Sequence, residues 1–154
     1  RAALDGLLAD PWFSRPPPKS TGREAFGAAF SIELIARCRA LGLSDDDILA
    51  TATALSAESI VLAFERFLAP RGGAATVIIG GGGVHNDTLM RSIASGLSPS
   101  RITTHEEFGI PSEAKEAIAF AVLGYETLHG RPGNVPSATG ATRRVVLGSI
   151  APPP

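Results

Sequence analysis

The sequence predicts an α/β protein, and three observations support this fold class. Residues 77–79 (Val-Ile-Ile) form a short β-branched apolar run, as expected for a strand covered on both faces. Four glycines follow at 80–83, and Asn86 or Asp87 can then cap a helix that begins near Thr88. A second short strand is predicted at 101–104, and helical patterns flank both strands. A strand, a glycine turn and a helix N-terminus in succession form the arrangement that α/β proteins use to hold nucleotides.

Composition indicates an ordinary globular domain. The 154 residues are 44% hydrophobic and 19% charged, and the net charge of −1 gives no indication of nucleic acid or a membrane surface as a partner. The single cysteine, Cys38, cannot form an internal disulfide, which fits a cytoplasmic setting. With no His or Asn/Asp partner marked by a motif, Cys38 is expected to be a packing or surface residue rather than a nucleophile. No apolar run approaches the roughly 20 residues of a membrane span, and the N-terminus has no signal-peptide pattern.

A proline-rich extended segment is predicted at 10–24, after a first helix within residues 1–9. Trp12 and Phe13 would anchor this segment in a core. It ends in a polar group whose ammonium, guanidinium and hydroxyl donors suit phosphate or sugar oxygens: Lys19, Ser20, Thr21 and Arg23. The alternative is purely structural, because Ser20 or Thr21 with Glu24 also makes a capping box for a helix predicted at 24–41.

A second long helix is predicted from Ser44, its N-cap, to about residue 68, with a break considered near residues 55–56. Its first turn holds Asp45, Asp46 and Asp47, where negative charge suits the helix dipole. Consecutive helical residues point in different directions around the axis, so this group favours a helix start over a metal site. We therefore predict no metal site in the chain.

The remaining elements follow from periodicity and turn residues. We predict a helix at 88–96, a loop at 105–111 and a helix at 113–129 capped by Ser112. The last of these is apolar on most of its circumference, which predicts deep burial. A loop at 132–140, a short strand at 145–147 and a frayed tail at 148–154 complete the chain.

The glycine turn matches no complete phosphate-binding motif. No Lys-Ser/Thr pair follows it, which excludes the P-loop, and His85 or Asn86 holds the third glycine position of the dinucleotide fingerprint. Glu106 or Glu107 can still mimic the ribose-binding acid of that fingerprint. The turn therefore predicts a generic nucleotide loop made of Gly80, Gly81, Gly82, Gly83 and Asn86, with a ligand-free structural turn as the alternative.

Glu116 is the candidate catalytic carboxylate, since it stands on the otherwise apolar helix at 113–129. It lies either in the exposed first turn of that helix or inside a cleft. A carboxylate in a cleft is a candidate acid, base or substrate ligand.

Four stretches in this order resemble the C-terminal half of the anhydro-N-acetylmuramic acid kinases. They are Pro-Pro-Lys-Ser-Thr-Gly-Arg-Glu at 17–24, Gly-Gly-Gly-Val-His-Asn-Asp-Thr-Leu-Met at 81–90, Glu-Ala-Ile-Ala-Phe-Ala at 116–121 and Gly-Asn-Val-Pro-Ser-Ala-Thr-Gly-Ala at 133–141. The resemblance runs from about residue 4 to residue 150. The first stretch is specific, whereas the glycine loop is shared across actin-like sugar kinases.

The resemblance implies the C-terminal lobe of an actin-like, ribonuclease-H-like fold, with a small sheet flanked by helices. It also implies an enzyme that uses ATP and Mg²⁺ to open 1,6-anhydro-N-acetylmuramic acid with water and phosphorylate O6, in the recycling of the bacterial cell wall. Gly80–Gly83 and Asn86 would lie against the adenosine of ATP, and Glu116 would help position the attacking water. Residues 19–24 would bind substrate or brace the site, and family members are thought to form homodimers.

The sequence also departs from the family pattern. The Gly-Thr-Ser-x-Asp-Gly phosphate motif and the Asp-Thr-Gly-Pro-Gly-Asn motif of the main catalytic aspartate are absent, and the chain starts at Arg1. We therefore expect residues 1–154 to be a single C-terminal lobe that is inactive alone. Two alternatives are a non-catalytic nucleotide-binding module and a Rossmann-type dehydrogenase domain.

Overall fold

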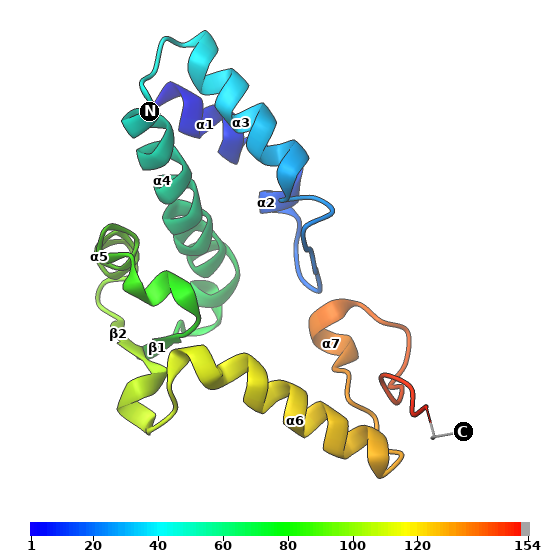
Figure 1. Cartoon of the computed structure of the whole chain (residues 1–154). Helices are drawn as coiled ribbons and strands as arrows, with labels where there is room; N and C mark the ends of the chain where they lie inside the picture. Colours follow the sequence, from blue (N-terminus) through cyan, green and yellow to red (C-terminus); the bar gives the residue numbers. More distant parts are fainter. Residues whose placement is uncertain (152–154) are drawn as a thin grey trace.

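The computed structural model describes residues 1–151, which form helices and a two-stranded parallel sheet, with the first three helices away from the sheet (Figure 1). The helices and strands follow in the order α1 Ala2–Leu8, α2 Pro11–Ser14, α3 Ala28–Ala40, α4 Asp45–Ala63, β1 Thr76–Ile79, α5 Asp87–Gly96, β2 Arg101–Thr104, α6 Lys115–Leu128 and α7 Pro136–Thr139. A π-helical turn η1 (Phe64–Leu68) and the 3₁₀ turns η2 (Ala69–Arg71), η3 (Gly82–His85), η4 (His105–Phe108) and η5 (Ser112–Ala114) connect them. The predicted α/β class is confirmed.

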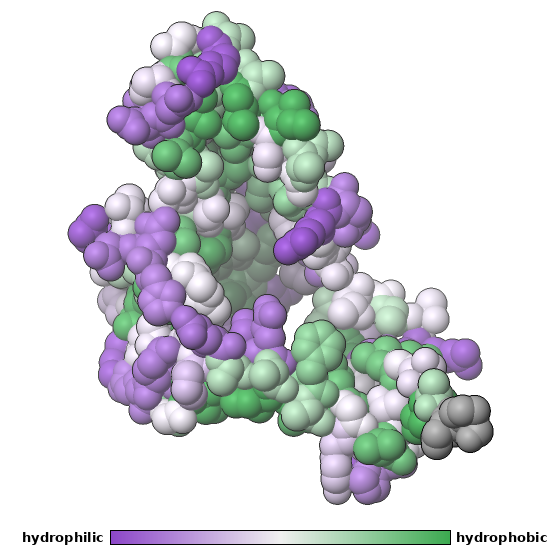
Figure 2. All heavy atoms as spheres, viewed as in Figure 1, coloured by the Kyte–Doolittle hydropathy of each residue, from purple (hydrophilic) through white to green (hydrophobic). Residues whose placement is uncertain are grey.

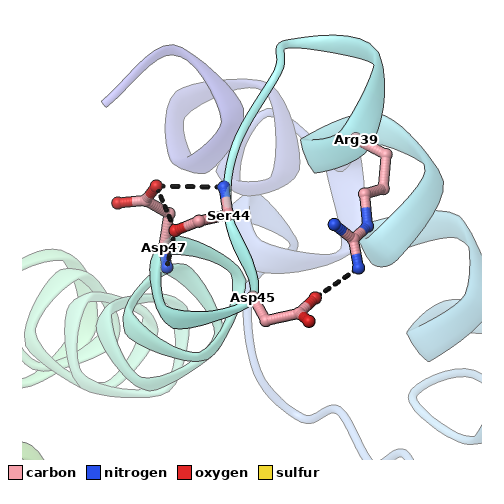
Figure 3. A network of polar contacts seen from close by, with 4 residues as sticks. All are labelled: Arg39, Ser44, Asp45 and Asp47. Carbon is pink, nitrogen blue, oxygen red and sulfur yellow. Dashed lines mark hydrogen bonds and ion pairs between the residues drawn. The ribbon is translucent and has the colours of Figure 1, made fainter.

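Helix α4 starts at the predicted Ser44 cap (Figure 3). The Asp47 N–H donates to Ser44 Oγ at 3.2 Å, and the Ser44 N–H donates to Asp47 Oδ2 at 3.0 Å. Asp45 pairs instead with Arg39 of α3. The carboxylates therefore serve the helix start, and the predicted use of this group is confirmed.

The break considered near residue 55 does not occur. Leu55 is buried, and the Ser56 hydroxyl donates to the Ala52 carbonyl at 3.1 Å, so the helix continues through both residues. The continuous stretch Asp45–Arg71 is long and apolar enough to cross a membrane, judged by those two properties alone, which the sequence analysis missed. Its contacts with α1, α3 and α5 give it a structural reason to be apolar.

Two hydrophobic cores share α4. The first joins α1, α3 and the start of α4 and contains Ala3, Leu4, Leu7, Leu34, Cys38, Ile48 and Leu55. The second joins the rest of α4 to α5 and the sheet, with Ala57, Ile93 and Leu97 buried and Val61, Phe64, Val77, Ile79, Leu89 and Ile102 packed against them. Cys38 is fully buried, so of the two roles expected for it the packing role is correct.

Helix α3 begins four residues later than predicted. The stretch 24–27 forms turns, so Glu24 does not complete a capping box with Ser20 or Thr21, and Gly27 is the N-cap without a side-chain hydrogen bond. The Arg23 carbonyl folds over Gly27 so closely that a Cβ there would lie 2.1 Å from its oxygen. Phe26 packs against Trp12, Phe13 and Phe30, which fixes this entry and confirms the predicted anchor.

The predicted extended segment at 10–24 is correct only in part. Its first residues form the short helix α2, capped by Asp10, whose Oδ1 accepts from the Trp12 N–H at 2.8 Å. Residues 15–22 contain no helix or strand.

Strands β1 and β2 pair in parallel, with Thr76 opposite Arg101 and Ile79 opposite Thr104. Helix α5 connects them and packs against α4. Val77 and Ile79 belong to the second core, whereas Ile78 is 45% exposed. The prediction that β1 is covered on both faces is therefore wrong for the described chain, because nothing in it covers the face of Ile78.

Helix α6 contradicts the prediction of deep burial. It begins at Lys115 after the turn η5, none of its residues is buried, and Phe120 is 71% exposed. Figure 1 shows α6 as an arm that leaves the sheet, and Figure 2 shows apolar surface along it. The apolar pattern is present, but the described residues place little against it.

The C-terminal predictions also change. The loop predicted at 132–140 contains the short helix α7, and residues 145–147 form no strand. The Val145 N–H donates instead to Asn134 Oδ1 at 2.7 Å, and the Gly133 N–H donates to the Val145 carbonyl at 3.1 Å. Residues 148–151 carry no helix or strand, and the rest of the predicted tail, 152–154, lies outside the described residues.

We predict that Ile93→Ala lowers the free energy of unfolding by about 2–5 kcal/mol, because this side chain is 1% exposed in the second core. The matched control is Ile118→Ala on α6, at a side chain that is 45% exposed, which should change stability by less than about 0.5 kcal/mol. Urea unfolding of both variants checks the pair. Equal losses would contradict the division between core and arm.

Candidate glycine-turn site

The glycine turn leaves the C-terminal end of β1 and leads into α5. Gly81 has φ +93°, a left-handed value that favours glycine, and the space around Gly81 and Gly82 is open. Asn86 then caps α5, since its Oδ1 accepts from the Leu89 N–H at 3.0 Å. The predicted cap is confirmed, and the turn offers an exposed, close-approach backbone at a helix N-terminus.

The packing of His105 requires a glycine at position 80. Because Ile79 pairs with Thr104, Gly80 and His105 both follow the last residues of adjacent parallel strands. A Cβ on Gly80 would lie 2.2 Å from His105 Nδ1. That Nδ1 atom is buried and has no hydrogen-bond partner among the described residues. Close packing between these two residues therefore fixes the base of the turn.

Glu106 fixes the other side of the site. Its Oε1 accepts from the Ser112 N–H at 2.7 Å, and its Oε2 accepts from the Ser112 hydroxyl at 2.8 Å. The Thr104 hydroxyl, followed by these two Ser112 donors, lowers the pKa of Glu106 to about 2. Ser112 was predicted to cap the next helix, but its hydroxyl is used by Glu106 and makes no helix cap.

The turns η3 and η5 contact each other, which brings the glycine turn beside the start of α6. His85 Nε2 lies 3.5 Å from Glu113 Oε1, a pair that is ionic only when the histidine is protonated. Glu116 follows three residues after Glu113 and is exposed in the first turn of α6. The structure thus brings two of the predicted groups together, the glycine turn and the helix start that carries Glu116.

The third predicted group, residues 19–24, lies elsewhere. Lys19 Nζ donates to the carbonyl of Trp12 at 3.1 Å and of Phe13 at 3.3 Å, and it stands 4.3 Å from the centroid of the Trp12 ring. Burial, then Arg66 and Arg15, lowers the pKa of Lys19. Lys19 therefore contacts its own segment and the Phe67 ring of η1, 5.2 Å from its centroid, rather than the glycine turn.

The rest of that group is exposed: Ser20, Thr21, Arg23 and Glu24. The Glu24 carboxylate folds back toward Gly22, since a Cβ on Gly22 would meet its Oε2 at 2.6 Å. Pro18, just before this group, packs near Gly140 at the end of α7, where a Cβ would lie 3.7 Å from Pro18 Cγ. Among the described residues, this segment therefore approaches the end of α7 and not Glu116.

The carboxylates after β2 do not serve as a free ribose-binding acid. Glu106 is engaged by Ser112 and Thr104, and Glu107 bonds Thr103 and Arg101. These contacts disfavour the dehydrogenase alternative. Within residues 1–151 no group of three or more His, Cys, Asp and Glu side chains could hold a metal ion.

Sequence reasoning missed His105 as the partner of Gly80 and Glu106 as the partner of Ser112. Both contacts depend on the strand register and on the fold of the loop 105–111, and no motif in the sequence marks either one.

We predict that Gly80→Ala destabilises the chain by about 1–3 kcal/mol, because the added methyl overlaps the His105 ring. Gly82→Ala is the matched control, since a Cβ there meets nothing within 4 Å. Urea unfolding measures both. The double variant Gly80→Ala/His105→Ala should recover part of the loss, and an additive double variant would contradict the contact.

We predict that the contribution of Glu106 to the free energy of unfolding depends on pH. Its pKa is lowered from 4.5 to about 2 in the folded chain, so this contribution is fully present above pH 4.5 and is lost as pH falls toward 2. The difference in urea midpoint between the unsubstituted chain and Glu106→Gln should therefore be constant above about pH 5 and shrink at pH 3. A difference that does not vary with pH would contradict the hydrogen-bonded carboxylate.

Comparison with known proteins identifies the family. The family model described as anhydro-N-acetylmuramic acid kinase matches residues 1–153. Proteins of that name from Bacillus cereus (strain G9842) and Salinibacter ruber are 50% identical over 153 residues and 41% identical over 150 residues. These alignments cover 98% and 97% of this chain but only 40% and 38% of the relatives, so the chain spans about two fifths of their length. The chain therefore belongs to the anhydro-N-acetylmuramic acid kinase family.

Proposed function

We propose that this chain supplies the C-terminal lobe of a cytoplasmic kinase with an actin-like fold. The whole protein would use ATP and Mg²⁺ to convert 1,6-anhydro-N-acetylmuramic acid to N-acetylmuramic acid 6-phosphate in cell-wall recycling. The observation that carries this proposal is the contact between η3 and η5, which puts an open glycine turn beside the helix start that holds Glu116. A nucleotide turn and a carboxylate must be neighbours if one site is to use both.

The glycine turn fits a nucleotide. Gly81 and Gly82 have open space where a side chain would otherwise lie, so a ligand can approach the backbone there. Asn86 Oδ1 is committed to the α5 cap, which leaves its Nδ2 group for a ligand. We assign no magnesium ligand to this chain, because its described residues offer no cluster of oxygen or nitrogen donors for one.

Glu116 would help to position and activate the water that attacks the anomeric carbon of the sugar. The main catalytic aspartate belongs to a motif that this chain does not contain. The bond from that carbon to the bridging oxygen breaks, and the freed O6 attacks the γ-phosphate, with ADP as the leaving group. Glu116 is exposed at the first turn of α6, so a substrate held by the rest of the protein can reach it.

The exposed apolar surface of α6 favours the proposal that this chain is part of a larger protein. Five large apolar or aromatic side chains on this helix are exposed: Ile118, Phe120, Val122, Tyr125 and Leu128. The relatives are more than twice as long as this chain, and their additional residues would cover such a surface. We propose that the lobe is inactive alone, because it lacks the phosphate motif and the main catalytic aspartate, and that the complete protein forms the homodimer.

The proposed function is tested with the longer protein that extends upstream of Arg1. Incubation with ATP, Mg²⁺ and 1,6-anhydro-N-acetylmuramic acid should give the 6-phosphate with an opened ring, and the 154-residue chain should give none. Binding of ATP without product would favour the nucleotide-binding module. A preference for NAD over ATP would favour the dehydrogenase.

We predict that Glu116→Gln lowers kcat of the longer protein by about 10²-fold or more, because a neutral amide orients and activates the attacking water less well than a carboxylate. The control is Glu126→Gln on the same helix, where the carboxylate pairs with Arg131 and not with the site. The control should keep kcat within about threefold, since an exposed ion pair contributes little. Near-normal turnover of Glu116→Gln would make Glu116 a structural residue.

A further inference from the structure

Glu106 holds the residue from which the α6 segment starts. Both oxygens of its carboxylate accept hydrogen bonds from Ser112, one from the N–H and one from the hydroxyl. Ser112 is 2% exposed and is the first residue of η5, the turn that leads directly into α6. We propose that Glu106 is a positioning residue that fixes where α6 begins and thereby places Glu116 beside the glycine turn. The catalytic part of this inference rests on the proposed function.

Packing against a core does not fix the position of α6, so polar contacts must fix it. No residue of α6 is buried, and its N-cap, Ala114, makes no side-chain hydrogen bond. Helices in folded proteins are normally held by an apolar face against a core, which this helix lacks within the described chain. Its start is held by the Glu106–Ser112 hydrogen bonds and by the contact of His85 with Glu113.

The Glu106–Ser112 pair is the stronger of these two constraints. A carboxylate that accepts two hydrogen bonds from one residue fixes both its position and its orientation. The Ser112 N–H is buried, and losing its acceptor would leave a buried donor unsatisfied. The His85–Glu113 contact is longer, at 3.5 Å, and joins two exposed side chains.

A displacement of Ser112 would reach Glu116. The two residues are four positions apart, and η5 leads directly into α6. A carboxylate that orients the attacking water must stay within hydrogen-bond reach of it, so a shift of about 1 Å is enough to lower turnover.

Glu107 provides a matched control in the same turn. It is the next residue, it also carries a hydrogen-bonded carboxylate, and its partners are Thr103 and Arg101 of β2. Glu107→Gln therefore removes the same charge from η4 without touching α6. Glu106→Gln keeps an acceptor oxygen for the Ser112 N–H, but its NH₂ group can only donate to the Ser112 hydroxyl, so both bonds become neutral and weaker than the charge-assisted pair.

The experiment compares these two variants in the longer protein by two readouts. Amide hydrogen exchange at residues 112–118 should accelerate at least tenfold in Glu106→Gln and stay within about threefold in Glu107→Gln. The kcat for the anhydro sugar should fall at least tenfold in Glu106→Gln alone, with KM for ATP within about threefold of the unsubstituted enzyme. General destabilisation would act on both variants and would not separate kcat from KM.

A second substitution, Ser112→Ala, distinguishes a local effect of Glu106→Gln from misfolding. Ser112→Ala removes the hydroxyl donor and keeps the N–H bond, so it should accelerate exchange by itself, and Glu106→Gln/Ser112→Ala should accelerate it by less than the two single effects combined, because both substitutions act on one pair. Unchanged exchange at residues 112–118 in Glu106→Gln would overturn the positioning role. If the unsubstituted longer protein has no kinase activity, the proposed function fails, while the exchange comparison still decides whether Glu106 fixes the start of α6.

Discussion

The rest of the structure depends on α4, because both hydrophobic cores are built on this one helix. Ile48 and Leu55 belong to the first core, and Ala57 belongs to the second. The capping box of Ser44 and Asp47 defines where the helix begins, and hence which side chains face each core. A change that shortened or rotated α4 would therefore disturb the helical subcore and the sheet together, although the two share no other helix.

The site follows from the sheet that α4 supports through α5. Parallel pairing of Ile79 with Thr104 places the residues after both strands at one edge, as is general for parallel sheets. Gly80 meets the His105 ring there, and Glu106 turns the chain toward Ser112. Glycine is thus required at two positions of this turn. Gly80 leaves room for the His105 ring, and Gly81 adopts a left-handed backbone conformation.

Local signals in the sequence predicted local features of the fold. The Ser44 and Asn86 caps and the two strands depend on neighbouring residues or on a strong local pattern, and all are confirmed. The predicted start of α3 was wrong because helix propensity does not account for the close approach of the Arg23 backbone to Gly27. The strand expected at 145–147 was wrong because Asn134 supplies the hydrogen bond that a neighbouring strand would have made.

The site was predictable only as separate pieces. Gly80–Gly83 and Glu116 were identified from the sequence, but their proximity depends on contacts of His105, Glu106 and Ser112 that no pattern signals. The roles of these pieces with ATP and substrate stay predictions. Residues 19–24 formed a convincing donor cluster in sequence, yet Lys19 is held by the carbonyls of Trp12 and Phe13.

Helix α6 shows why an apolar pattern does not by itself predict burial. An apolar pattern is typical of a packed helix, whereas burial requires a partner surface, and the described residues supply little of one. The chain spans about two fifths of its relatives, and the apolar side chains of α6 remain exposed. A helix in that condition is positioned by hydrogen bonds at its start, where a single displaced donor matters more than it would beside a packed core. The boundary between the two cores and this exposed arm passes between Glu106 and Glu116, so the Glu106–Ser112 hydrogen bonds, together with the contact between η3 and η5, fix the carboxylate relative to the glycine turn.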